Sequence, residues 1–368
     1  MNHEQRECFE IITNAITLHE QNPDSPASFF LHGPAGTGKT FLYNVLCSHY
    51  SAQRKIVLCV ASSGIAAQLL PGGRTAHSRF KIPLTINQLA MSNISRNSAL
   101  ASLIQQTHLI IWDEVPMQHR YCFEAVSRTL NDICRASPDA HFGSIPIILG
   151  GDFAQILPIV RHGSRQATIQ ACIQHRPIWH HLKVLRLVQN MRIIETSANH
   201  QEFLNFITGV ERNPQMSGNL PIPDMISTVR SMESFCDSVY PPELLRNAVK
   251  DPNCFTSRAI LAFRNDTVHD FNNRLMDHMF GELHVFHAAN TVDLNEQAVE
   301  AEPLAAEVLQ SIDLASLPPS CLKLKIGAPV ILLRNFSPIN GLCNGTRLRI
   351  MEIGTNYLKV AILGGTWD

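Results

Sequence analysis

Five short, mostly apolar runs recur along the first half of the chain, and stretches with helical spacing separate them. The runs lie at residues 28–32, 56–60, 108–112, 145–149 and 183–187. Each has the length of one strand and shows no regular alternation of apolar and polar positions, which is typical of strands buried on both faces. Strands of this kind that alternate with helices predict a parallel sheet covered by helices on both sides. We therefore expect an α/β fold in this half.

The second half of the chain has a looser pattern. A proline-rich segment at residues 213–224, with helix-like sequence on either side, predicts a helical connector. A strand is then expected at residues 258–263 and a helix at residues 265–279. Three closely spaced strands, separated by Gly and Asn turn residues, are expected at residues 328–333, 347–353 and 357–363. Their spacing predicts a small antiparallel or barrel-like module.

Composition allows two domains of ordinary size, because 45% of the 368 residues are apolar. The chain is almost neutral overall, with 30 Lys and Arg against 31 Asp and Glu. Basic residues nevertheless cluster at 153–194 and 315–351, which contain no Asp or Glu. A polyanionic partner would have to bind such local clusters, although solvated surface charge explains them equally well.

The ten cysteines are scattered singly, without a CxxC pair. This pattern favours a reduced intracellular compartment over a disulfide framework. The sequence also lacks any run of about 18 apolar residues, so no membrane span is expected.

A glycine-rich motif follows the first apolar run and precedes a helical stretch. It matches GxxxxGK[ST] and consists of Gly33, Pro34, Ala35, Gly36, Thr37, Gly38, Lys39 and Thr40. Glycines at this spacing let backbone N–H groups surround a β-phosphate at the start of a helix. Lys39 would neutralise β- and γ-phosphate oxygens, and Thr40 would bind Mg²⁺. The order strand, motif, helix predicts an ATP site rather than a chance match.

Polar residues follow three later strands of the predicted sheet. Asp113 and Glu114 come directly after the run at 108–112, where Asp113 suits the Mg²⁺ shell and Glu114 suits a general base for the attacking water. Alone, such a pair is more often a strand-end turn. Gln155 could bind the γ-phosphate or its water, or be an ordinary loop residue, and Arg192 could supply positive charge to the transition state.

Six motifs together resemble a known family. In order they are GPAGTGKT at 33–40, ASSGIAA at 61–67, GGRTAHSRFKIP at 72–83, WDEVPM at 112–117, GGDFAQILPI at 150–159 and LRLVQNMR at 185–192. They resemble the petite-integration-frequency (PIF) type DNA helicases of superfamily one. Within that group, the motif sequences are most similar to those of the helicases of Helitron transposons. The resemblance runs from about Asn2 to Gly345.

The resemblance implies a RecA-like P-loop NTPase lobe with a parallel sheet, then a partial second RecA-like lobe that carries a small β-barrel-like insertion. On this basis we expect an N-terminal ATPase lobe at residues 1–195 and a helical connector at 196–256. The second lobe would begin at 257–315, and the inserted β module would occupy 316–368. Residues 120–135 match the family's signature helix, and their apolar spacing supports a helix.

Further site residues follow from the resemblance alone. Gln5 is similar to the glutamine that reads adenine in this family. Ser62, Ser63, His77 and Phe80 resemble the region that grips single-stranded DNA. Small hydroxyl residues allow a phosphate backbone to approach, and the Phe80 ring could stack on a base, although packing in the core is the alternative for Phe80.

The implied activity is ATP-driven movement 5′ to 3′ on single-stranded DNA, with forked or duplex DNA as a further partner and a monomer as the working form. The resemblance also implies a nuclear or mitochondrial location and roles in DNA repair, recombination and telomere maintenance. Later family motifs, runs like KSQG and ALSR, do not occur in the sequence. We therefore expect a truncated helicase core. The alternative is a transposon-derived remnant that binds nucleotide and single-stranded DNA without catalysis.

Overall fold

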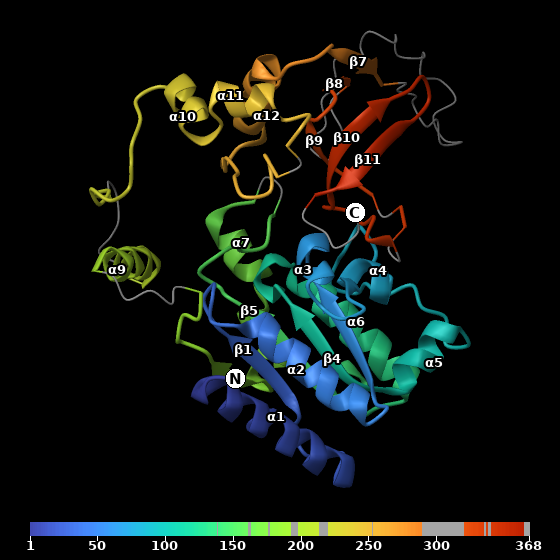
Figure 1. Cartoon of the computed structure of the whole chain (residues 1–368). Helices are drawn as coiled ribbons and strands as arrows, with labels where there is room; N and C mark the ends of the chain where they lie inside the picture. The colour runs from blue at the N-terminus through green and yellow to red at the C-terminus, as the bar shows by residue number, and fades with distance from the viewer. Residues whose placement is uncertain are drawn as a thin grey trace. The chain divides into compact units, whose positions relative to one another are not determined.

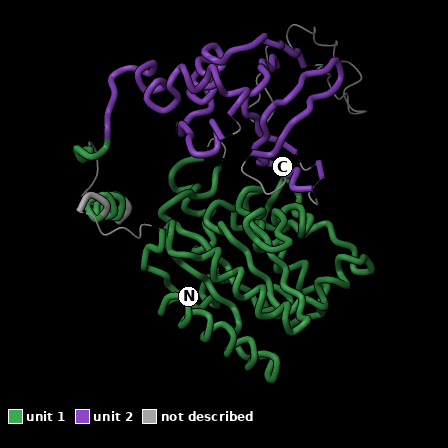
Figure 2. Tube along the Cα trace, in the orientation of Figure 1, with its two compact units in different colours: residues 1–226 green, residues 227–368 purple. Residues whose placement is uncertain are grey.

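The computed structural model of the chain divides into two compact units, residues 1–226 and residues 227–368 (Figure 2). It describes residues 1–137, 139–160, 163–175, 177–192, 198–212, 220–251, 253–288, 320–334, 336–337 and 340–363. This division is coarser than the four segments expected from the sequence, whose boundaries stay predictions.

Unit 1 is built around a six-stranded parallel sheet (Figure 1). Its strands are β1 (Ser28–His32), β2 (Ile56–Ala61), β3 (Arg74–Thr75), β4 (Thr107–Asp113), β5 (Ile147–Gly151) and β6 (Lys183–Arg186). The order across the sheet is β3-β2-β4-β5-β1-β6, so the chain crosses over between non-consecutive strands. All pairs are parallel, which brings the loops after the strands to one edge.

Helices lie before, between and after these strands along the chain. They are α1 (His3–Gln21), α2 (Lys39–Ala52), α3 (Gly64–Gln68), α4 (Ala76–Phe80), α5 (Ala99–Gln105), α6 (Arg120–Cys134), α7 (Arg165–Ala171), α8 (Pro177–His180) and α9 (Ala198–Arg212). Single turns of 3₁₀ helix occur at η1 (Val115–Met117), η2 (Phe142–Ser144) and η3 (Ile173–His175). In the described parts of the chain, no helix has both the length and the apolar character needed to cross a membrane.

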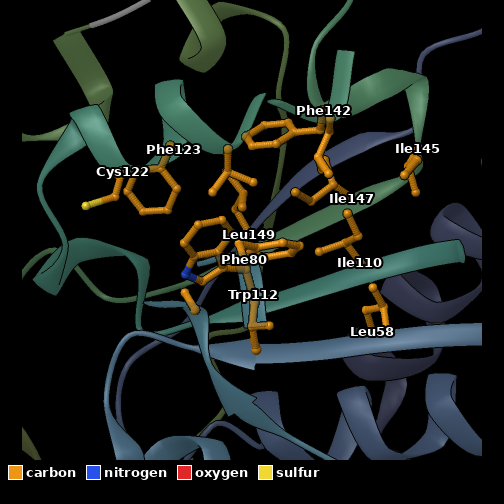
Figure 3. Close-up of a cluster of buried hydrophobic side chains, with 14 of the residues drawn as sticks. Leu58, Phe80, Ile110, Trp112, Cys122, Phe123, Phe142, Ile145, Ile147 and Leu149 are labelled. Atoms are coloured by element: carbon orange, nitrogen blue, oxygen red, sulfur yellow. The ribbon is translucent and has the colours of Figure 1, made fainter. Parts of the chain in front are cut away.

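Two apolar clusters cover the two faces of the sheet because successive strand residues point to opposite sides. On β4, Leu109 and Ile111 join the cluster that contains residues of α1 and α2, whereas Ile110 and Trp112 join the cluster that contains residues of α5 and α6. Figure 3 shows part of the second cluster, where the rings of Trp112 and Phe123 lie 4.6 Å apart. The continuous apolar character of these strands follows from burial on both faces.

The predicted parallel sheet is therefore confirmed, as is the helix at residues 120–135, which is α6. The prediction places the strand at 145–149 slightly too early, because β5 covers Ile147–Gly151. Its paired position beside β1 and β4 explains the shift, because the ladder begins at residue 147 on both sides.

Unit 2 contains helices and two small antiparallel sheets. The helices are α10 (Met232–Val239), α11 (Pro242–Arg246) and α12 (Asn265–His278). Strands β7 (His284–His287) and β8 (Cys321–Leu324) form one sheet, and β9 (Pro329–Ile331), β10 (Arg347–Ile353) and β11 (Leu358–Ile362) form the other, in the order β11-β10-β9. The antiparallel module and the helix at 265–279 thus match their predictions. The connector segment predicted at 213–224 lies mostly outside the described residues.

One expectation for unit 2 is wrong, and a second holds only in part. Residues 258–263 belong to no strand, and Leu261 and Phe263 in this run are exposed. An apolar run becomes a strand only when neighbouring strands complete its hydrogen bonds. The basic stretch 315–351 is only partly a charged surface in its described part, where Lys323, Arg334 and Arg347 are exposed. Lys325 and Arg349 are buried, and with Arg347 they donate hydrogen bonds to main-chain carbonyls of unit 2.

Candidate ATP site and adjoining DNA segment

The cradle at residues 33–40 is a tight loop between β1 and α2. Gly36 and Gly38 have left-handed φ angles of 86° and 84°, which a residue with a side chain adopts at a cost. Gly33 is required for space, since a Cβ there would lie 2.5 Å from Oγ1 of Thr37. The Thr37 hydroxyl donates to the Pro34 carbonyl at 2.9 Å. The loop is therefore closed by its own contacts, and its glycines keep side chains out of it.

The first turn of α2 has no side-chain cap. Its N-cap residue is Gly38, whereas α3 is capped by Ser63 and α4 by Thr75. The N–H groups of this turn thus lack a capping side chain, and with the helix dipole they favour an anion. Lys39 Nζ donates to the carbonyls of Gly33 and Pro34, so its ammonium group lies over the cradle.

Asp113 lies at the end of β4 and is 5% exposed. The hydroxyl of Tyr43, on α2, donates to its Oδ1 at 3.3 Å. Burial raises the pKa of the Asp113 carboxyl, while the Glu114 N–H, the Lys39 charge and the Tyr43 hydroxyl oppose this shift. The buried Asp113 carboxylate, which feels the charge of Lys39, and the hydroxyl of Thr40 in the first turn of α2 are the oxygen ligands that Mg²⁺ prefers, so these two residues fit that ion.

Glu114 has a left-handed backbone, with φ 54° and ψ 38°. Such a conformation costs a residue with a side chain free energy and recurs at functional sites. Burial, followed by the neighbouring charge of Asp113, raises the pKa of the Glu114 carboxyl, and the Asp152 charge adds to the rise. A raised pKa brings a carboxylate nearer to the value that suits a general base at neutral pH.

Gln155 is exposed beyond the end of β5, and Asp152 holds it there. Nε2 of Gln155 donates to Oδ2 of Asp152 at 3.1 Å, and Oδ1 of Asp152 accepts from the Ala154 N–H at 3.0 Å. Asp152 is itself 3% exposed. The amide is thus fixed at the edge of the sheet that also carries Glu114.

The Arg192 segment lies against the cradle. The Met191 N–H donates to the Gly36 carbonyl at 2.7 Å, and a Cβ at Gly36 would lie 3.2 Å from Cβ of Arg192. Arg192 is exposed, and its N–H donates to Oδ1 of Asn190 at 2.9 Å. Residues 190–192 and the glycine-rich loop are therefore neighbours although about 150 positions separate them.

Gln5 also contacts the cradle, through an amide that is hydrogen-bonded at both ends. Its Nε2 donates to the Thr37 carbonyl at 3.1 Å, and its Oε1 accepts from the Asn2 N–H at 3.1 Å. The residue is 3% exposed. In this structure Gln5 braces the loop and the start of α1, and its contact with adenine stays a prediction.

The predicted DNA segment adjoins the ATP site. Ala61 pairs with Asp113 across β2 and β4, and with Thr75 across β2 and β3. This register places Ser62 and Ser63, just after β2, and His77, in the first turn of α4 just after β3, at the carboxyl edge. The Ser63 hydroxyl caps α3 by accepting from the Ala66 N–H, and burial lowers the pKa of His77.

Phe80 is the exception, and its predicted stacking role is wrong. The residue is fully buried, and its ring lies 5.5 Å from that of Trp112 in the core cluster (Figure 3). A base cannot stack on a ring whose faces are already covered by apolar side chains. The alternative of core packing holds.

Known proteins similar to this chain identify its family. The family described as PIF1-like helicase matches residues 1–213, and the Pif1 helicase 2B domain matches residues 307–353. The chain belongs to the PIF1-like helicase family. It is 28% identical to the ATP-dependent DNA helicase PIF1 of Danio rerio over 332 residues, which cover 88% of this chain and 44% of that protein. With its counterpart from Candida albicans it shares 25% identity over 336 residues, 89% of this chain and 33% of that protein.

A solved PIF1-like structure shares the fold. The crystal structure of Pif1 helicase from Bacteroides in complex with ADP-AlF3 and ssDNA has a TM-score of 0.60 and 19% identity, and the match covers 96% of this chain and 72% of that one. This PIF1-like chain spans between a third and a half of the two helicases from Candida albicans and Danio rerio.

Sequence reasoning missed four residues of this PIF1-like site. Two of them, Tyr43 and Asp152, contact Asp113 and Gln155. The others are Gly150, where a Cβ would meet the Tyr43 hydroxyl, and Gln118, whose Oε1 accepts from the Ser62 hydroxyl. The sequence Gly150-Gly151-Asp152 at the end of β5 could have indicated Gly150 and Asp152. Glycine weakens a strand, so two glycines at a strand end suggest that another group approaches the backbone closely there. Tyr43 and Gln118 gave no signal of their own, since an apolar helix face accepts Tyr and a loop accepts Gln without any special role.

Proposed function

We propose that the chain is an ATP-dependent DNA helicase, which couples ATP hydrolysis at the cradle to 5′-to-3′ movement along single-stranded DNA. The observation that carries this proposal is the shared edge of the sheet. Asp113 ends the strand that pairs with β2, and the Ser62 N–H, just after β2, donates to the Asp113 carbonyl at 3.1 Å. ATP-handling residues and the DNA segment are therefore one hydrogen bond apart.

At the ATP site, each residue has a role that its position allows. The cradle N–H groups and Lys39 would bind the β- and γ-phosphates. Mg²⁺, held by Thr40 and Asp113, would neutralise phosphate charge when bound with the nucleotide. Glu114 would accept the proton of the attacking water, and Gln155 would orient that water.

Arg192 would supply positive charge to the transferring phosphoryl group, a contribution of about 10³ to 10⁵ in rate where an arginine plays this part. Its support is the hydrogen bond from the next residue of the chain to the cradle, Met191 N–H to the Gly36 carbonyl. The exposed side chain of Arg192 is free to turn toward a bound nucleotide.

At the DNA site, Ser62, Ser63 and His77 would contact the phosphate backbone of single-stranded DNA. Hydroxyl groups and a half-buried imidazole suit such contacts because they donate hydrogen bonds without bulk. Forked or duplex DNA would be the substrate for unwinding, with a monomer as the working form.

We extend the proposal to the evolutionary origin, the biological roles and the cellular location of the protein, on the basis of the motif sequences alone. The six motifs between residues 33 and 192 support kinship with Helitron helicases. Roles in DNA repair, recombination and telomere maintenance, in the nucleus or the mitochondrion, belong to the same proposal.

ATP hydrolysis measured with and without single-stranded DNA, followed by strand displacement on a forked duplex, tests the proposed function. Hydrolysis that rises with DNA and is accompanied by unwinding is the expected result. Binding of both nucleotide and DNA with no turnover would instead identify the chain as a non-catalytic remnant.

A further inference from the structure

Tyr43 carries a buried hydroxyl at a place where the core needs only a ring. The residue is fully buried on α2, among apolar neighbours on the face of the sheet covered by α1 and α2. Phenylalanine would fill the same space, and a buried hydroxyl without a partner costs free energy. The partner that the structure describes for this hydroxyl is Oδ1 of Asp113, at 3.3 Å.

Gly150 on β5 makes room for that hydroxyl. A Cβ at this position would lie 1.7 Å from the Tyr43 hydroxyl oxygen and 3.5 Å from Oδ1 of Asp113. Gly150 is not among the glycines with left-handed φ, so backbone freedom does not explain the absence of a side chain. The space is kept for the hydroxyl, and two strands and one helix meet there: β4, β5 and α2.

We propose that Tyr43 is a positioning residue, which orients the Asp113 carboxylate for Mg²⁺ and couples α2 to the metal site. This inference rests on the proposed ATP site. Because Tyr43 lies one helical turn after Lys39 and Thr40, a single rigid helix then carries both the phosphate-binding groups and the group that fixes the opposing carboxylate. Partners of metal ligands typically contribute 10- to 100-fold to metal affinity or activity.

The test is Mg²⁺-dependent binding of a fluorescent ATP analogue to the 368-residue chain. Tyr43→Phe removes only the hydroxyl. We expect unchanged analogue affinity in EDTA, and a rise of about tenfold or more in the Mg²⁺ concentration that gives half of the metal-dependent gain in affinity. Gly150→Ala, on β5, would place a Cβ against the Tyr43 hydroxyl and so disturb the same hydrogen bond. It should shift the Mg²⁺ curve in the same direction.

Tyr50→Phe is the matched control. Tyr50 is also buried on α2, and its hydroxyl has no hydrogen-bond partner among the residues that the structure describes. Its removal should leave the Mg²⁺ curve in place. Overlapping curves for wild type and Tyr43→Phe would overturn the inference alone. A wild-type chain that binds no nucleotide would overturn the proposed function and the inference with it.

Discussion

The Ser62 N–H donates a hydrogen bond of 3.1 Å to the carbonyl of Asp113. Ser62 begins the proposed DNA segment, and Asp113 belongs to the proposed metal site. A second contact supports this one, because the Ser62 hydroxyl donates to Oε1 of Gln118 at 3.0 Å, and Gln118 is buried. Any displacement of Ser62 by a DNA phosphate would therefore act on the segment 113–118.

Gln118→Ala removes the side-chain acceptor of the Ser62 hydroxyl and leaves every residue assigned to nucleotide or DNA binding unchanged. We expect basal ATP hydrolysis to stay within about twofold and stimulation by single-stranded DNA to fall, because coupling free energies between sites are typically 1–3 kcal/mol. The measurement is the ratio of rates with and without DNA. Loss of basal hydrolysis in equal proportion would assign Gln118 to the ATP site itself.

Glu114→Gln keeps the shape of the side chain and removes the base. The expected result is ATP binding close to that of wild type, with turnover reduced by about 10² to 10⁴, the usual contribution of a general base. Single-turnover hydrolysis and analogue binding separate the two effects. Glu7→Gln, at an exposed position on α1, is the control. ATP turnover close to that of wild type in Glu114→Gln would show that another residue acts as the general base.

Phe80→Ala should destabilise unit 1 by about 3–5 kcal/mol, since it empties a fully buried position beside Trp112. Urea denaturation measures this loss. Phe41→Ala is the control, because Phe41 is 48% exposed and should change stability little. A Phe80 variant with unchanged stability but weaker DNA binding would restore the stacking role.

The interaction of Glu20 with Lys55 should make the stability of unit 1 depend on pH. Hydrogen bonding to Lys55 lowers the pKa of the Glu20 carboxyl below its ordinary value of 4.5, and His108 adds to this effect. A carboxyl with a depressed folded pKa stabilises the fold above its unfolded pKa, and this contribution is lost as pH falls through the folded pKa.

Glu20→Gln should therefore lower stability near pH 7 by up to about 1 kcal/mol, because the pair is partly exposed. The difference from wild type should vanish as the pH falls below 4.5. Melting temperatures over this pH range provide the measurement. A difference that persists undiminished in acid would show that the effect is not electrostatic.

The sheet could be predicted because its physical cause lies in the sequence. Strands buried on both faces need continuous apolar runs, and a phosphate cradle needs glycines at fixed spacing. The proximity of Arg192 to Gly36 followed in part, since both come from strand ends that a parallel sheet gathers at one edge. The strand predicted at residues 258–263 is absent, because an apolar run alone does not show whether a neighbouring strand is available to pair with it.

Side-chain environment was harder to predict than backbone position. Phe80 lies in a motif that resembles a DNA-binding region, yet only the packing against Trp112 shows which way its ring points. Tyr43 could not be selected from its helix, because its role depends on a carboxylate seventy positions later and on a missing Cβ at Gly150. Such relationships require three-dimensional contacts.

Lys39→Ala tests the central claim most directly. ATP hydrolysis by wild type and by this variant would be compared with and without single-stranded DNA, while the melting temperature reports the fold, and Lys359→Ala, exposed on β11, serves as control. The account predicts DNA-stimulated hydrolysis in wild type and in the control, and none in Lys39→Ala at an unchanged melting temperature. DNA-stimulated hydrolysis that persists in Lys39→Ala would contradict the assignment of the cradle as the ATP site.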